Sequence, residues 1–194
     1  GTAAGDVWDN FDIASTVHPT GIGGGNNSMM YTLPAMVDGV AINASYTPRS
    51  ATADATTAWN VSYTGVEGLT ASYAMGDGAT ENTDGTAMKV SYVFGPITAS
   101  YSNYEYDTTG TASDDETDSF AVSYTVSDEI SVTYGTEEVS RGTLEDAEFS
   151  SISAAYTAGG MTISAAMQEA NDMDGTTAAN QDRDRWALGL SFAF

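Results

Sequence analysis

Apolar and polar residues alternate along most of the chain. Residues 40–46, for example, read Val-Ala-Ile-Asn-Ala-Ser-Tyr, in which every second position from Val40 is apolar. A period of two is the pattern of a β-strand with one apolar face. The pattern predicts eleven strands, at 28–33, 40–46, 59–63, 69–73, 88–94, 97–101, 119–126, 130–134, 151–156, 161–167 and 185–194.

The connections between these segments alternate between short and long. The short ones are 34–39, 64–68, 95–96, 127–128 and 158–160, and the long ones are 48–57, 76–85, 103–117, 136–148 and 168–184. This asymmetry predicts an all-β fold, a transmembrane antiparallel up-and-down β-barrel with its short turns at one end. A soluble β-sandwich or jelly roll also alternates and is the alternative. The small polar residues on the second face, and strands without edge-protecting lysines, favour the barrel.

The charge distribution agrees with a membrane barrel. The chain has 27 acidic and 5 basic residues among 194, a formal net charge of -22. Twenty of the acids fall in the long connections or at their rims, and we expect none on the apolar face of a strand. A charge on the lipid-facing side of a barrel is destabilising, which explains this placement.

Composition also excludes several functions. So acidic a chain lacks the basic surface of a nucleic-acid-binding protein. There is no cysteine, and His18 is the single histidine, so neither a thiolate metal site nor a histidine-based catalytic triad is expected. With no catalytic motif visible, we expect no enzyme. No apolar run reaches the roughly 20 residues of a spanning helix. The start of the chain shows no basic segment followed by an apolar one, as a signal peptide would have, and no initiator Met, so the chain is expected to begin as a mature or cleaved product.

Two segments carry a family resemblance. The last ten residues, Arg-Trp-Ala-Leu-Gly-Leu-Ser-Phe-Ala-Phe, resemble the terminal strand of a Gram-negative outer-membrane protein, whose alternating aromatics and final Phe are read by the barrel-assembly machinery. Residues 26–46 resemble a porin pattern that follows the inward-folded third loop of general trimeric porins. The resemblance implies that Trp186, Phe192 and Phe194 form the assembly signal, and that the protein resides in the bacterial outer membrane.

General porins have 16 strands, and the pattern here predicts eleven. If residues 1–25 are the inward-folded constriction loop, the strand that begins at Asn26 corresponds to the sixth of sixteen. Strands six to sixteen number eleven, which equals the number predicted here. The resemblance therefore implies a constriction loop at 1–25, and at 26–194 the transmembrane strands of a 16-stranded barrel with short periplasmic turns and long acidic extracellular loops. The alternative is a complete barrel of ten or twelve strands.

The candidate functional residues are charged groups of the pore. Asp6, Asp9 and Asp12 lie in an acidic and aromatic cluster that, by the resemblance, forms one side of the pore constriction; a flexible acidic tail is the alternative. Lys89, Arg183 and Arg185 alternate with the apolar residues of their strands, so they are expected to face the lumen, although Lys89 could instead pair with a neighbouring acid. Charges across a narrow lumen set ion selectivity.

These features predict a porin for passive diffusion of ions and small polar solutes, with a preference for cations. The alternative is a surface-binding protein, such as an adhesin, a surface-layer component or a phage receptor, acting through its acidic loops. The expected partners are outer-membrane lipid, lipopolysaccharide and, by the resemblance, two further copies in a homotrimer. No cofactor is expected, apart from divalent cations held loosely by the acidic loops.

Overall fold

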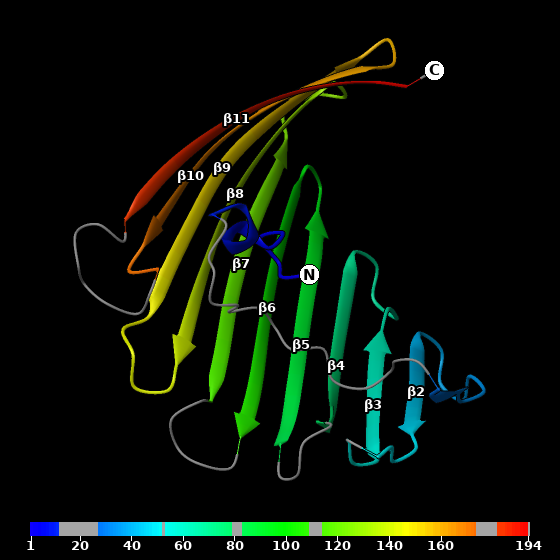
Figure 1. Ribbon diagram of the computed structural model, residues 1–194. Helices are drawn as coiled ribbons and strands as arrows, with labels where there is room; N and C mark the ends of the chain where they lie inside the picture. Colours follow the sequence, from blue (N-terminus) through cyan, green and yellow to red (C-terminus); the bar gives the residue numbers. More distant parts are fainter. Residues whose placement is uncertain (12–26, 52, 79–82, 109–113, 174–181, 194) are drawn as a thin grey trace.

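A computed structural model describes residues 1–11, 27–51, 53–78, 83–108, 114–173 and 182–193. Its strands form one antiparallel sheet in which each strand pairs with its neighbours in sequence, from β1 to β11 (Figure 1). The elements are η1 (Val7–Phe11), β1 (Met29–Thr32), β2 (Val40–Thr47), β3 (Thr56–Tyr63), β4 (Leu69–Asp77), β5 (Thr83–Phe94), β6 (Ile97–Thr108), β7 (Asp115–Thr125), β8 (Ile130–Arg141), β9 (Ala147–Ala158), β10 (Met161–Asn171) and β11 (Arg183–Phe192). The eleven predicted strands and their up-and-down order are confirmed.

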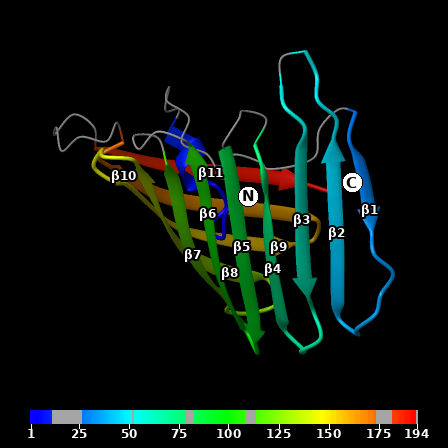
Figure 2. The ribbon, with the colours of Figure 1, turned by 90° about the horizontal axis from the view of Figure 1, so that it is seen from below.

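The sheet curves strongly, and the N-terminal segment lies against its concave side (Figure 1). Figure 2, which views the molecule from below, shows the same segment inside the curve formed by the longer strands. Its short 3₁₀ helix, η1, contacts β8, β9 and β10. Among the described residues no helix is long and apolar enough to cross a membrane.

The pairing register shows which residues share a face. Lys89 pairs with Ser102, Ser102 with Ser119, Ser119 with Glu137, and Glu137 with Phe149. Paired residues of neighbouring strands project to the same side of a sheet. This row faces inward, because its members contact the N-terminal segment.

The opposite face is apolar and open. Its exposed side chains include Trp59, Tyr134, Met167, Trp186 and Leu188, the last two more than 70% exposed. An apolar face of this extent cannot lie against water without cost, so it marks a contact with lipid or protein. The predicted division into one small polar face and one apolar face therefore holds.

The apolar band crosses the strands obliquely. Trp59 of β3 lies in the same register row as Met75, Thr86, Glu105 and Glu116, so an apolar position on β3 corresponds to acidic positions on β6 and β7. In a barrel with tilted strands, paired residues of neighbouring strands lie at different depths in the membrane. An apolar band that stays at one depth therefore occupies different register rows on successive strands. The shift therefore fits tilted, membrane-spanning strands.

The prediction that no acid falls on the apolar face is wrong. Ten of the twelve acids in the strands share the parity of the outward apolar residues: Asp77, Asp84, Glu105, Asp107, Glu116, Asp118, Glu138, Glu148, Glu169 and Asp184. The physical reason is strand length. A strand such as β6 has 12 residues, which span about 40 Å at roughly 3.3 Å per residue, whereas the apolar band of a barrel is about 25 Å tall. The strands thus continue beyond the band into segments predicted as loops, and the acids occupy that extension.

Candidate pore-lining site

The N-terminal segment is attached to the inner wall by its backbone. The Ala3 N–H donates to Ser102 Oγ at 2.8 Å, and the Ala4 N–H donates to Ser119 Oγ at 2.8 Å. The two serines are paired across β6 and β7. Because the serines are nearly fully buried, these hydrogen bonds satisfy groups that have lost contact with water.

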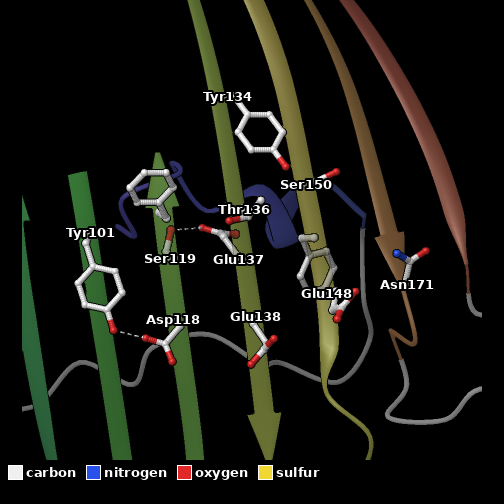
Figure 3. A pocket seen from close by; sticks show the side chains of 12 residues that line it. Tyr101, Asp118, Ser119, Tyr134, Thr136, Glu137, Glu138, Glu148, Ser150 and Asn171 are labelled. Carbon is white, nitrogen blue, oxygen red and sulfur yellow. Dashed lines mark hydrogen bonds between the residues drawn. The ribbon is translucent and has the colours of Figure 1, made fainter. Parts of the chain in front are cut away.

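Glu137 lies at the centre of this attachment and is 2% exposed. Its Oε1 accepts hydrogen bonds from the Thr2 hydroxyl and, at 3.4 Å, from the Ser119 hydroxyl; its Oε2 accepts the Trp8 N–H at 3.1 Å. Figure 3 shows the bond between Ser119 and Glu137 behind the strands. One carboxylate therefore binds Thr2 and Trp8, on either side of the turn at Gly5 and Asp6.

Lys89 occupies one end of the inward row. Its ammonium donates to the main-chain carbonyls of Gly1 at 3.2 Å and Thr2 at 3.4 Å, and the Tyr104 hydroxyl donates to the same Gly1 carbonyl at 3.0 Å. The inward direction agrees with the sequence prediction, and these partners are carbonyls rather than a carboxylate. The positive charge of Lys89 is therefore not cancelled by them.

An apolar cluster completes the attachment on the other side. Val7 and Phe11 of η1 are buried against Val139, Ala147, Phe149, Ala170 and Met173. The Phe11 and Phe149 rings lie 5.9 Å apart between centroids, at 43°, within the range of favourable aromatic pairs. This inner-wall cluster was not predicted from the sequence. The sequence feature that could have revealed it is Phe149, a large apolar residue at a position where the alternation places side chains on the inner, mostly polar face.

The three predicted constriction acids differ in their surroundings. Asp6 is half-buried; its Oδ1 accepts the Thr2 N–H at 2.8 Å, and its own N–H donates to Thr2 Oγ1 at 2.8 Å. Asp9 is exposed on η1. Asp12 lies outside the described residues. Asp6 therefore has a local structural role in a turn with positive φ, whereas the carboxylate of Asp9 is free to face solvent.

The inward positions of the strands carry most of the basic residues. Lys89, Arg141, Arg183 and Arg185 share the inward parity, together with two acids, Asp115 and the buried Glu137. Arg185 Nη1 donates to Gln168 Oε1 at 2.7 Å, and Arg183 is exposed. Within the described strands the two faces are thus separated by charge: all four bases point inward and ten of twelve acids point outward.

Neutral polar side chains line the rest of the inner wall. Thr32 Oγ1 donates to Asn43 Oδ1 at 2.7 Å, and Asn43 Nδ2 donates to Asn60 Oδ1 at 2.8 Å, forming a ladder over β1 to β3. Ser123 and Thr133 are hydrogen-bonded at 2.8 Å in the same way on β7 and β8. Such a surface is readily hydrated, as the lining of a water-filled channel requires.

A depression of about 510 Å³ opens on the outward face, opposite η1 (Figure 3). Tyr101 and Tyr134 border it on the apolar side, and Asp118, Glu138 and Glu148 on the acidic side. The Tyr101 hydroxyl donates to Asp118. In the described part of the chain, no group of three or more acidic or histidine side chains has a metal-binding arrangement. Parts of the acidic loops, at 52, 79–82, 109–113 and 174–181, lie outside the described residues.

The proposed assembly signal is visible in part. Trp186 and Phe192 of β11 are outward and exposed, at 79% and 56%. Phe194 lies outside the described residues. The described residues of this terminal strand thus have the alternation that the family resemblance predicted.

Comparison with known proteins defines the class of this fold and lining. The family model described as Gram-negative porin matches residues 1–194. The chain belongs to the Gram-negative porin family and to the bacterial outer membrane, and it is an all-β transmembrane barrel chain.

Solved structures agree on the fold. The anion-selective porin from Comamonas acidovorans is 16% identical, with 75% of this chain and 49% of that chain covered and a TM-score of 0.62. Pseudomonas aeruginosa OccK8 (OprE) is 11% identical, covering 83% and 60%, with a TM-score of 0.62. A mutant of the Rh. blastica porin is 18% identical, covering 87% and 56%, with a TM-score of 0.57. The chain spans about half to three-fifths of these structures' lengths. A search of curated proteins gives no significant match.

Proposed function

We propose that the protein is a passive diffusion pore for ions and small polar solutes, and that residues 1–25 form its constriction. The observation that supports this most is the attachment of Gly1–Phe11 to the polar inner wall, with Asp9 exposed. A segment folded against the wall narrows the path without closing it. In this proposal residues 26–194 form part of a 16-stranded barrel, whose further strands pair with the free edges of β1 and β11.

We further propose a preference for cations that depends on the constriction more than on the acidic loops. Ten strand acids face outward, away from the path, and the inward positions carry bases. Charges more than about 8–10 Å from a permeating ion are largely screened at physiological ionic strength. Cation preference therefore requires carboxylates within that range, and we take Asp9 as the candidate because it is the exposed acid of the described part of the segment.

A reversal potential across a salt gradient tests this preference. The wild-type protein is expected to favour cations in dilute salt and less so in concentrated salt. Asp9→Asn should move the reversal potential towards anions, whereas the control Glu148→Gln, which removes one charge from the outward face, should leave it unchanged. Anion selectivity of the wild-type protein in dilute salt would refute the proposal.

The lipid partners follow from the outward face. Its carboxylates adjoin the exposed aromatics, at the level where lipid headgroups meet a barrel. Lipopolysaccharide is itself anionic, so contact at this level would need divalent cations between the two surfaces. We propose such loosely held cations and no defined metal site. A homotrimer is the oligomer that the family resemblance implies; migration of an unheated, detergent-extracted sample as a monomer would contradict it.

A further inference from the structure

We propose that Glu137 is a positioning residue that fixes how far the N-terminal segment projects into the pore, and so sets its conductance. The inference rests on the proposed function, in which this segment is the constriction. The exposed Asp9 and the narrowness of the path both depend on where the segment is held. Glu137 touches the segment and not the permeating solute, so it acts through the segment's position.

The hydrogen bonds single out Glu137 among the wall residues. Ser102 and Ser119 each bind one backbone N–H of the segment, at adjacent positions. Glu137 binds Thr2 and Trp8, which lie on either side of the turn at Gly5 and Asp6. A contact to one point permits pivoting, whereas contacts to both arms of a turn fix its orientation. Glu137 is therefore the wall group that holds the turn as a unit.

The neighbouring Gly135 shows how closely the segment approaches the wall. A Cβ added at Gly135 would lie 2.8 Å from the Ala4 Cβ and 3.3 Å from the Ala4 Cα. Gly135 projects inward on β8, one inward position before Glu137. The wall thus has a hollow at Gly135 that admits Ala4 and a carboxylate beside it that retains the segment.

Neutralising Glu137 should release the turn without unfolding the strands. In Glu137→Gln an NH₂ group replaces one of the two carboxylate oxygens, so the amide oxygen can accept from Trp8, and Thr2 is left with at most a neutral bond in which its hydroxyl accepts from the NH₂ group. The charge-assisted bonds to both arms of the turn are therefore lost. Losing a hydrogen bond to a charged, buried acceptor shifts an equilibrium by roughly tenfold to a hundredfold. The docked segment should then exchange with an undocked one, which appears as larger and noisier current steps.

Single-channel recording of the intact protein in planar bilayers tests the proposal against a matched control. Glu138→Gln removes the same charge one residue further on, where the side chain faces outward. We expect Glu137→Gln to raise the mean step and its open-channel noise, and Glu138→Gln to match the wild-type protein. Heat-modifiable migration on gels verifies that each variant has a folded barrel.

A disulfide tether separates position from other effects of the substitution. The chain has no cysteine, so Ala4→Cys with Gly135→Cys introduces a single pair. Movement of the segment by about 1 Å away from the wall reaches the Cβ separation of a disulfide. In the Glu137→Gln background, oxidation should restore the wild-type step and reduction should abolish that rescue. Equal steps for Glu137→Gln and wild type, or no rescue on oxidation, would overturn the role of Glu137. Absence of any steps from the wild-type protein would instead overturn the proposed function.

Discussion

Ala165 and Ala166 of β10 offer a direct test of the two faces of the sheet. Ala165 projects outward between Ile163 and Met167, and it pairs with Ala154 and Leu188, near the middle of the apolar band. Arginine at the bilayer midplane on the lipid face costs about 2–4 kcal/mol. Ala165→Arg should therefore lower the folding equilibrium constant roughly 30- to 1,000-fold.

The adjacent position provides the control. Ala166 projects inward and pairs with the small residues Ser153 and Ala187, so Ala166→Arg places its charge in the aqueous lumen at little cost. Urea unfolding in lipid vesicles, followed by tryptophan fluorescence and heat-modifiable migration, measures both free energies. Equal destabilisation by the two variants would refute the assignment of the faces, since the substitutions differ only in the side on which they project.

Three further predictions concern the segment, the outward acids and the terminal strand. Phe11→Ala removes the ring packed on Phe149. Large-to-small changes of buried Phe cost about 3–5 kcal/mol, so the attachment of the segment should weaken and the current steps should grow. The control Phe94→Ala, which removes an exposed ring, should not alter the steps. Chelation of divalent cations should lower the melting temperature of the protein in lipopolysaccharide-containing membranes but not in zwitterionic lipid. Equal melting temperatures with and without the chelator in the lipopolysaccharide-containing membranes would contradict the cation bridge. Joint replacement of Trp186 and Phe192 by Ala should reduce the amount of assembled protein in the outer membrane, as measured by heat-modifiable migration, and undiminished assembly would show that these residues are not part of the signal.

The strands and their faces could be predicted because the information is local. A period of two fixes the side to which each residue projects, so the inward direction of Lys89, Arg183 and Arg185 followed from parity alone. The ends of the strands were harder to predict. Asp and Glu at the outer strand ends have low strand propensity, yet pairing with a long neighbour extends β6 and β7 into the predicted loops.

The attachment of the segment could not be derived from local pattern. Thr2 and Glu137 are 135 residues apart in sequence, and nothing in the alternation shows which inward position receives the segment. Glu137 was counted among loop acids, because its burial depends on the segment that covers it. Asp6 was grouped with Asp9 by composition, and only the Thr2 hydrogen bonds distinguish a turn-forming carboxylate from an exposed one.

Single-channel recording of the wild-type protein tests the central claim most directly. Reconstituted into a planar bilayer, the intact folded protein should produce uniform stepwise increases in conductance that persist at low voltage, because in the proposed barrel the polar inner wall lines a continuous aqueous path. Inserted, heat-modifiable protein that gives no steps over a range of salt concentrations would contradict the claim that this barrel is a diffusion pore.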